Sequence, residues 1–243
     1  MYHSVTFGSM NTFSDWHLVP DSRPVVAMPE RKIVTVEVPG SNGILDLSES
    51  LTGYPVYNNR QGTMKFHVLN DMESWERIYE RMSNYIHGKK TTMTLEDDPE
   101  YYYEGRYTVK WTSNNDGTWS DVEIGYDLEP FKYFYLTSVQ EDPSFYKGIV
   151  ASNTAKTLDF SKEYTIGTVP VIPEFVMSNV SGSGTTLAFV NAELNINKTV
   201  AITSNGNRKY YDMVISNISG GNTCTLTISG TGTVNVVFRR MSL

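Results

Sequence analysis

Hydrophobic and polar residues alternate with a period of two along most of the chain. The alternation runs through residues 33–38, residues 62–69, residues 101–111 and residues 122–128. Successive side chains of a strand point to opposite faces, so this pattern predicts β-strands rather than helices. The last two segments flank the turn sequence Asn114–Gly117, which predicts one long hairpin.

One segment has the helical period instead. Between residues 71 and 87, apolar side chains recur at spacings of three and four, which predicts one amphipathic helix over about 71–87. The stripe consists of Trp75, Ile78, Tyr79, Met82, Tyr85 and Ile86. Asn70 with Glu73 three residues later predicts the N-terminal cap, and Gly88 follows the last turn. We expect the stripe to be a packing face.

Composition divides the chain into two parts. Residues 1–135 hold 12 Lys and Arg against 20 Asp and Glu, a net charge of −8, together with all four tryptophans and all four histidines. Residues 136–243 have a net charge of +1 and are rich in Gly, Ser, Thr and Asn. A break of this kind predicts two domains, 1–135 and 136–243. Short strands between glycine- and asparagine-rich turns predict an all-β sandwich for the second.

The residues predict no enzyme, no cofactor and no metal site. There is no phosphate-binding glycine loop and no nucleophile elbow. The four histidines lack metal-ligand spacing, and the one cysteine, Cys224, lies in a strand-like segment without a histidine nearby. The acidic run Glu96–Glu100 is typical of a solvated turn rather than a calcium loop. Neither part has the basic excess of a nucleic-acid-binding protein.

The stretch Val38–Glu49, VPGSNGILDLSE, combines a glycine-rich turn with an apolar and acidic run. Pro39 presets φ, and Gly40 and Gly43 tolerate positive φ, so a turn is predicted. The run from Ile44 to Leu47 would be an exposed apolar surface if it did not fold onto its own domain. Both readings remain open: an ordinary hairpin or a contact with another chain.

Taken together, these segments resemble the distal tail protein family, often called Dit, of long non-contractile-tailed phages of Gram-positive bacteria. The resemblance covers roughly residues 1–135, and residues 136–243 match mainly in architecture. It rests on Val5–Gly8 with Trp16, on Val36–Ser48, on Tyr57–Arg60 before the strand Met64–Val68, on Ile86–Lys89, and on Val236–Arg240. It implies a mainly β protein with two domains. The N-terminal domain is ring-forming and β-sandwich-like, with one helix and a long hairpin, and the C-terminal domain is a galectin-like all-β sandwich.

The resemblance also implies a function. Members form a homo-hexameric ring, the baseplate hub of the host adsorption apparatus, at the tip of the virion tail. The ring joins the tail tube protein to the tail-associated fibre or lysin protein, and DNA passes through its channel. Receptor-binding proteins are further expected partners, through the C-terminal domain. The resemblance therefore implies a virion protein that is made in the host cytoplasm and has no membrane partner. The expected protein-interface residues are Gly40, Gly43, Ile44, Leu45, Leu47, Tyr57 and Arg60.

Two other functions are considered. The C-terminal sandwich could be a carbohydrate-binding module for attachment to the host surface, with Tyr210 and Tyr211 as its candidate stacking residues. Packing between strands is the favoured explanation of this pair, because aromatic residues are common in strands. A glycan hydrolase needs two facing carboxylates, and nothing marks a specific pair. For the ring, an acidic lumen is expected. Its candidate residues are Asp46, Glu49, Glu96, Asp97, Asp98 and Glu100.

Overall fold

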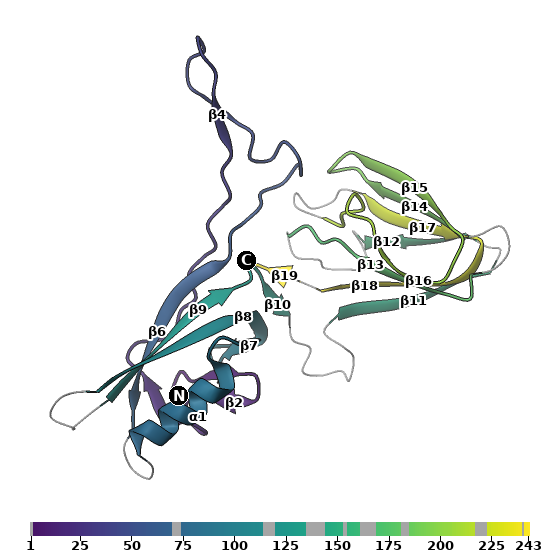
Figure 1. Ribbon diagram of the computed structural model, residues 1–243. Coiled ribbons are helices and arrows are strands. Elements are labelled where there is room, and N and C mark those ends of the chain that lie inside the picture. Colours follow the sequence, from purple (N-terminus) through teal and green to yellow (C-terminus); the bar gives the residue numbers. More distant parts are fainter. Residues whose placement is uncertain are drawn as a thin grey trace. The chain divides into compact units, whose positions relative to one another are not determined.

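The computed structural model describes residues 2–69, 74–113, 120–134, 144–152, 155–160, 169–180, 185–216, 223–239 and 241–243, with backbone alone for 113 and 144–152. The chain divides into two compact units (Figure 1). Unit 1 is Met1–Tyr135 together with Leu243, and unit 2 is Leu136–Ser242. This division falls where the composition changes. Each unit is described by itself below.

In its described residues, unit 1 is built from short and long strands and one helix. The strands are β1 (Val5–Phe7), β2 (Met10–Asn11), β3 (Leu18–Pro20), β4 (Thr35–Glu37), β5 (Ile44–Asp46), β6 (Arg60–Val68), β7 (Lys90–Leu95), β8 (Asp98–Ser113), β9 (Ser120–Leu128) and β10 (Lys132–Phe134). The main sheet has the order β2-β1-β7-β8-β9-β6-β3, and β10 pairs with β8. These pairings are antiparallel.

The predicted long hairpin is confirmed as β8 and β9. Their register is regular from Gly105↔Leu128 to Ser113↔Ser120. The predicted turn Asn114–Gly117 lies outside the described residues. Along β9, every second side chain is buried, which is the alternation that the sequence shows.

The predicted helix is also confirmed, as α1 (Trp75–Ile86), with its start four residues later than expected. Ser74 occupies the N-cap position, whereas Asn70 and Glu73 lie outside the described residues. Ile78, Met82 and Ile86 recur every fourth residue and are buried, so they form the stripe that packs against β8. They belong to one buried core together with Phe7 of β1, Trp16, Phe66 of β6 and Tyr107 of β8.

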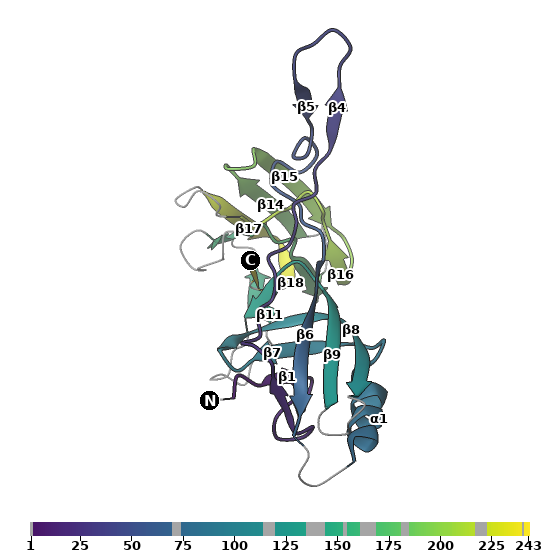
Figure 2. The same ribbon diagram turned by 90° about the vertical axis from the view of Figure 1, so that its left-hand side faces the viewer.

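Residues 29–59 leave the main sheet as a long arm that carries β4 and β5 (Figures 1 and 2). These two strands pair only with each other and form a separate two-stranded sheet. The strand expected over residues 33–38 is therefore shorter, Thr35–Glu37, and all three of its side chains are exposed. The alternation of this segment reflects strand structure here, but it does not reflect packing against the body of unit 1.

Unit 2 is an all-β sandwich, as the sequence predicts. Its strands are β11 (Ser144–Ser152), β12 (Lys156–Asp159), β13 (Glu174–Ser178), β14 (Thr185–Asn191), β15 (Ile196–Ile202), β16 (Gly206–Lys209), β17 (Cys224–Ser229), β18 (Thr231–Arg239) and β19 (Met241–Ser242). One sheet has the order β11-β18-β13-β16 and the other β12-β17-β14-β15. Phe175, Leu187, Phe189, Leu226 and Val236 come from both sheets and belong to one buried cluster.

Cys224 is buried in this cluster, and burial raises the pKa of its thiol to about 11. A buried, protonated thiol is a poor nucleophile, so Cys224 acts as a small apolar residue of the core. In the described part of the chain, no helix has both the length and the apolar character needed to cross a membrane.

Candidate protein-interaction surface

The arm is held together by its own backbone and one ion pair. Where it leaves the sheet, the N–H of Lys32 donates to the carbonyl of Val56 at 2.7 Å, and Asn58 N–H donates to Glu30 at 2.8 Å. Farther out, β4 and β5 pair in the register Thr35↔Asp46 to Glu37↔Ile44. Arg31 contacts Glu49 at 2.5 Å. The arm is therefore a defined ribbon of two antiparallel segments rather than an irregular loop.

The glycine-rich turn at the tip joins the two strands as predicted. Gly40 and Gly43 both have φ of +81°, in the left-handed region that residues with a side chain rarely adopt. An added Cβ would meet nothing within 4 Å at either position. These glycines are thus required by backbone conformation and not by a close neighbour within the chain.

The register of β4 and β5 places the side chains of the arm on two faces, one apolar and one mostly polar. Residues directly opposite each other on paired strands point to the same face. Val36 lies opposite Leu45, and the N–H of Leu47 donates to the carbonyl of Val34. One face is accordingly formed by Val34, Val36, Val38, Leu45 and Leu47, which we call the apolar face of the arm. The opposite face carries Thr35, Glu37, Ile44 and Asp46.

Nothing in the described part of unit 1 covers the apolar face. Its five side chains are between 36% and 55% exposed, although valine and leucine are usually buried. A contiguous apolar surface of this kind on a soluble chain is typical of a contact with another molecule. Leu51, in the turn that follows Leu47, is 98% exposed and extends the apolar character of the arm.

The structure distributes the expected interface residues over different places. Leu45 and Leu47 share the apolar face, whereas Ile44 is exposed on the opposite, mostly polar face. Val34, Val36 and Val38 were not among the expected interface residues, because an alternating segment predicts a strand of the main β-structure. The spacing Val-x-Val-x-Val was the signal that could have revealed them, since it places three valines on one face.

The expectation that Arg60 is an interface residue needs correction, because Arg60 does not lie on the surface. Its side chain is 2% exposed. Nε donates to the carbonyl of Pro130 at 2.8 Å, and Nη1 donates to the carbonyl of Ala27 at 3.1 Å. Its guanidinium also lies over the ring of Tyr103, 5.5 Å from the centroid. Burial lowers the pKa of Arg60. Arg60 fastens the base of the arm to the sheet and cannot itself contact a partner.

Tyr57 also lies at the base of the arm, half-buried. Its ring meets that of Phe131 edge to face, with the centroids 5.8 Å apart. Its backbone forms an isolated antiparallel bridge with Arg31, on the opposite side of the arm. Tyr57 therefore supports the direction in which the arm leaves the sheet.

The expected lumen acids are largely engaged within unit 1. Glu96 accepts from the N–H of Ser4 at 2.7 Å, and Asp98 contacts Lys132 at 2.7 Å. Asp97 contacts both His3 and Arg23, at 2.9 and 2.8 Å. On the arm, Glu49 pairs with Arg31 and Asp46 accepts from the hydroxyl of Ser48. Glu100 is exposed. Local cations and donors offset much of this negative charge.

His67 lies outside the arm, and two carboxylates hold its imidazole ring in place. Nδ1 of His67 lies 2.5 Å from Asp121, and Nε2 lies 3.0 Å from Asp21. The hydrogen bond with Asp121 raises the pKa of His67, and the weaker effect of the hydrogen bond with Asp21 acts in the same direction. Among the described residues, no group of three or more His, Cys, Asp or Glu side chains could hold a metal ion.

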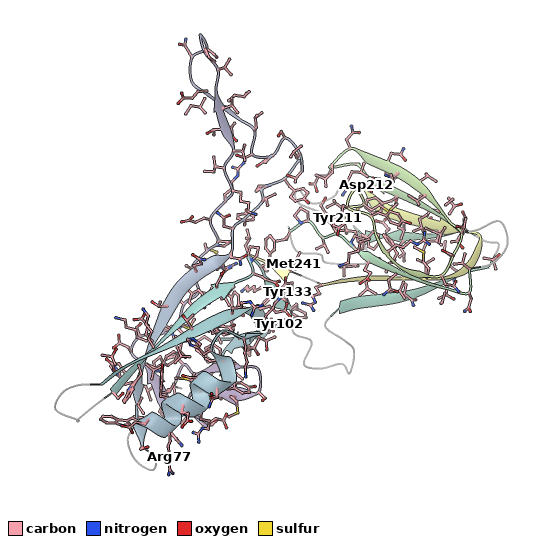
Figure 3. The ribbon with its side chains drawn as sticks, viewed as in Figure 1. Arg77, Tyr102, Tyr133, Tyr211, Asp212 and Met241 are labelled. Atoms are coloured by element: carbon pink, nitrogen blue, oxygen red, sulfur yellow. The ribbon has the colours of Figure 1, made fainter. Side chains whose placement is uncertain are left out.

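Tyr210 and Tyr211 lie in different environments, one packed and one exposed. The ring of Tyr210 lies 5.9 Å from that of Phe175 and packs against the core of unit 2. Tyr211 is 77% exposed and adjoins Asp212, whose carboxylate is paired with Lys198 (Figure 3). Packing therefore explains Tyr210 but not Tyr211.

Comparison with solved structures identifies the architecture. The chain is similar over its full length to the Dit protein of phage SPP1, with a TM-score of 0.62, 12% sequence identity and 100% coverage of both chains. The chain has the fold of a phage distal tail protein. The Dit structure is described as a paradigm of the hub adsorption apparatus of phages that infect Gram-positive bacteria. No family model matches the sequence. No curated protein matches it either.

Proposed function

We propose that this protein is a structural component of a phage tail, a distal hub in which copies of the chain assemble into a ring at the tail tip. The full-length likeness to the Dit fold carries this proposal, because it extends over both units. In this role the ring is hexameric and non-enzymatic, surrounds a channel for DNA, and joins the tail tube protein to the fibre or lysin protein. Receptor-binding proteins are further partners, through unit 2.

The uncovered apolar face of the arm supports the assembly. Within one chain it remains exposed to water, and its burial against another copy would be favourable. An interface between two different surfaces of the same chain produces a closed ring when the rotation between copies closes. The arm provides one such surface, and the body of unit 1 must then provide the other.

Mass and shape test this proposal. Sedimentation velocity of the purified chain, and of the chain mixed with its tail partners, should reveal a hexamer of the 27.4 kDa chain. Negative-stain images should show rings with a central opening. A chain that remains monomeric alone and with candidate tail tube and fibre proteins would refute the hub assignment.

A carbohydrate-binding role for unit 2 is the second candidate, and the exposure of Tyr211 favours it. Sugar rings stack on exposed aromatic side chains, and neighbouring charged groups can fix their hydroxyls. Tyr211 with Asp212 and Lys198 offers both features. Retention of the protein on host cell-wall polysaccharide, and loss of retention in Tyr211→Ala, would support this role. Equal retention of the variant and the unsubstituted chain would exclude Tyr211 as the contact.

A further inference from the structure

The chain contains the sequence Ser-Asn-Gly twice, at residues 41–43 in the tip of the arm and at residues 204–206 in unit 2. In an Asn-Gly pair, the backbone nitrogen of glycine can attack the side-chain carbonyl carbon of asparagine, because glycine has no Cβ that obstructs the approach. Asn42 and Asn205 are both exposed. Since the local sequence and the exposure match, a difference in reactivity between the two pairs depends on the fold.

At the tip of the arm, both reacting groups are free. Asn42 lies in the turn between β4 and β5, at the end of the arm far from the main sheet (Figures 1 and 2). Its backbone carbonyl accepts from the hydroxyl of Ser41 at 3.5 Å. Among the described residues, neither the side-chain amide of Asn42 nor the N–H of Gly43 has a hydrogen-bond partner. No neighbour lies within 4 Å of a Cβ placed on Gly43, so the turn has space to rearrange.

The second pair, in unit 2, is held in place by the fold. The side-chain oxygen of Asn205 accepts from the N–H of Val180 at 2.9 Å. Gly206 is the first residue of β16 and is paired with Met177 of β13. Before the nitrogen of Gly206 could reach the side chain of Asn205, the hydrogen bond with Val180 would have to break and the start of β16 would have to separate from β13. The structure therefore protects Asn205 and leaves Asn42 unprotected.

We propose that Asn42 is a site of self-modification, at which the tip of the arm forms a succinimide and then aspartate or isoaspartate without an enzyme. A bond forms between the backbone nitrogen of Gly43 and Cγ of Asn42, and the bond between Cγ and Nδ2 breaks. Nδ2 leaves as ammonia, with the proton that the N–H of Gly43 releases. One water molecule then opens the ring at either carbonyl carbon, which gives aspartate or isoaspartate. No electrons are transferred, and water is the only co-reactant.

The isoaspartate product changes the turn that sets the register of the arm. Its main chain passes through Cβ and Cγ of residue 42, so the turn gains one backbone atom and a free carboxylate. The turn connects strands that pair in the register Thr35↔Asp46 to Glu37↔Ile44. Turn geometry fixes register in a hairpin, and the new charge repels the carboxylates of Glu37 and Asp46. Conversion of Asn42 therefore loosens the pairing of β4 with β5.

Peptide mapping of the purified full chain tests this proposal. The chain is incubated at physiological temperature and pH and digested, its peptides are identified by mass spectrometry, and isoaspartate is measured by methylation with an isoaspartyl methyltransferase. Asn42 should convert at least about tenfold faster than Asn205, because Asn205 must first lose a hydrogen bond and strand pairing. Equal rates at the two sites, or no conversion of Asn42, would overturn the proposal.

Two variants and one change of solvent provide the controls. Asn42→Gln should abolish the isoaspartate signal of the arm tip, because glutamine would have to close a larger ring. Asn205→Gln should leave that signal unchanged. In urea that unfolds the chain, the two sites of the unsubstituted protein should react at similar rates, because both lie between serine and glycine. A difference that persists in urea would refute the protection of Asn205 by the fold.

Amide hydrogen exchange tests the effect of the modification on the arm. The chain that contains isoaspartate is separated from the fresh chain by chromatography, and exchange is compared by mass spectrometry. Exchange should be faster over residues 35–46 in the modified chain and unchanged in β8 and β9, because the arm pairs only with itself. Unchanged exchange over residues 35–46 would refute the loosening of β4 and β5. These measurements use the isolated chain and do not depend on the proposed hub function.

Discussion

The apolar face of the arm should contribute to assembly and little to folding, and the double substitution Val36→Ala with Leu45→Ala tests this. These two side chains lie opposite each other on β4 and β5 and are about half exposed. Full burial of a valine or leucine side chain contributes about 1.5–3 kcal/mol. The exposed half of each therefore has about 0.8–1.5 kcal/mol to gain in an interface.

Removing both side chains should weaken each contact by about 1.5–3 kcal/mol, or roughly ten- to a hundredfold in the dissociation constant. The free energy of unfolding should change by about 1 kcal/mol or less, because the covered halves of the two side chains lie mainly against each other. Sedimentation equilibrium measures the first quantity, and urea denaturation followed by circular dichroism measures the second.

Ile44→Ala is the matched control. Ile44 adjoins Leu45 in sequence and is also exposed, but it lies on the opposite face of the arm. We expect its association to match that of the unsubstituted chain. The reasoning fails if the double variant loses several kcal/mol of stability, which would place the face in a core, or if Ile44→Ala weakens assembly as strongly as the double variant.

Three further substitutions test other parts of the structure. Arg60→Met should lower the free energy of unfolding by about 2–4 kcal/mol in urea denaturation, because it leaves the carbonyls of Pro130 and Ala27 without their donor. His67 has a raised pKa, so its contribution is complete below about pH 6.5 and is lost as the pH rises through the raised value. Thermal melts should therefore fall with pH in that window, and less in His67→Gln; parallel curves would contradict this. Tyr211→Ala should leave the melt unchanged because its side chain packs little, and a drop of several degrees would place Tyr211 in the core.

Periodicity was sufficient to predict β6, β8 and β9 of the main sheet and the helix α1. The alternation of buried and exposed side chains along β9, and the stripe Ile78, Met82 and Ile86 on α1, are local consequences of strand and helix geometry. The start of α1 was less predictable. Ser74 follows the expected cap closely in sequence, and both serine and asparagine are good capping residues.

The candidate site was predicted only in part. The sequence directed attention to Leu45 and Leu47 because their apolar run follows a glycine-rich turn. It could not pair them with Val36, since cross-strand neighbours depend on register. Arg60 was expected at an interface only through the family resemblance of the segment Tyr57–Arg60. The structure buries Arg60 between carbonyls from two distant segments, which no local pattern indicates.

The sequence by itself determined the mainly β character, the helix α1 and the positive-φ turn at Gly40 and Gly43, because these depend on interactions between residues close in the chain. Only the tertiary structure decided that β4 and β5 leave the main sheet and that their valines and leucines share one uncovered face. An alternating strand looks the same in sequence whether it borders a core or extends into solvent. The difference depends on which surfaces the rest of the fold brings against it, and for the arm the described chain brings none.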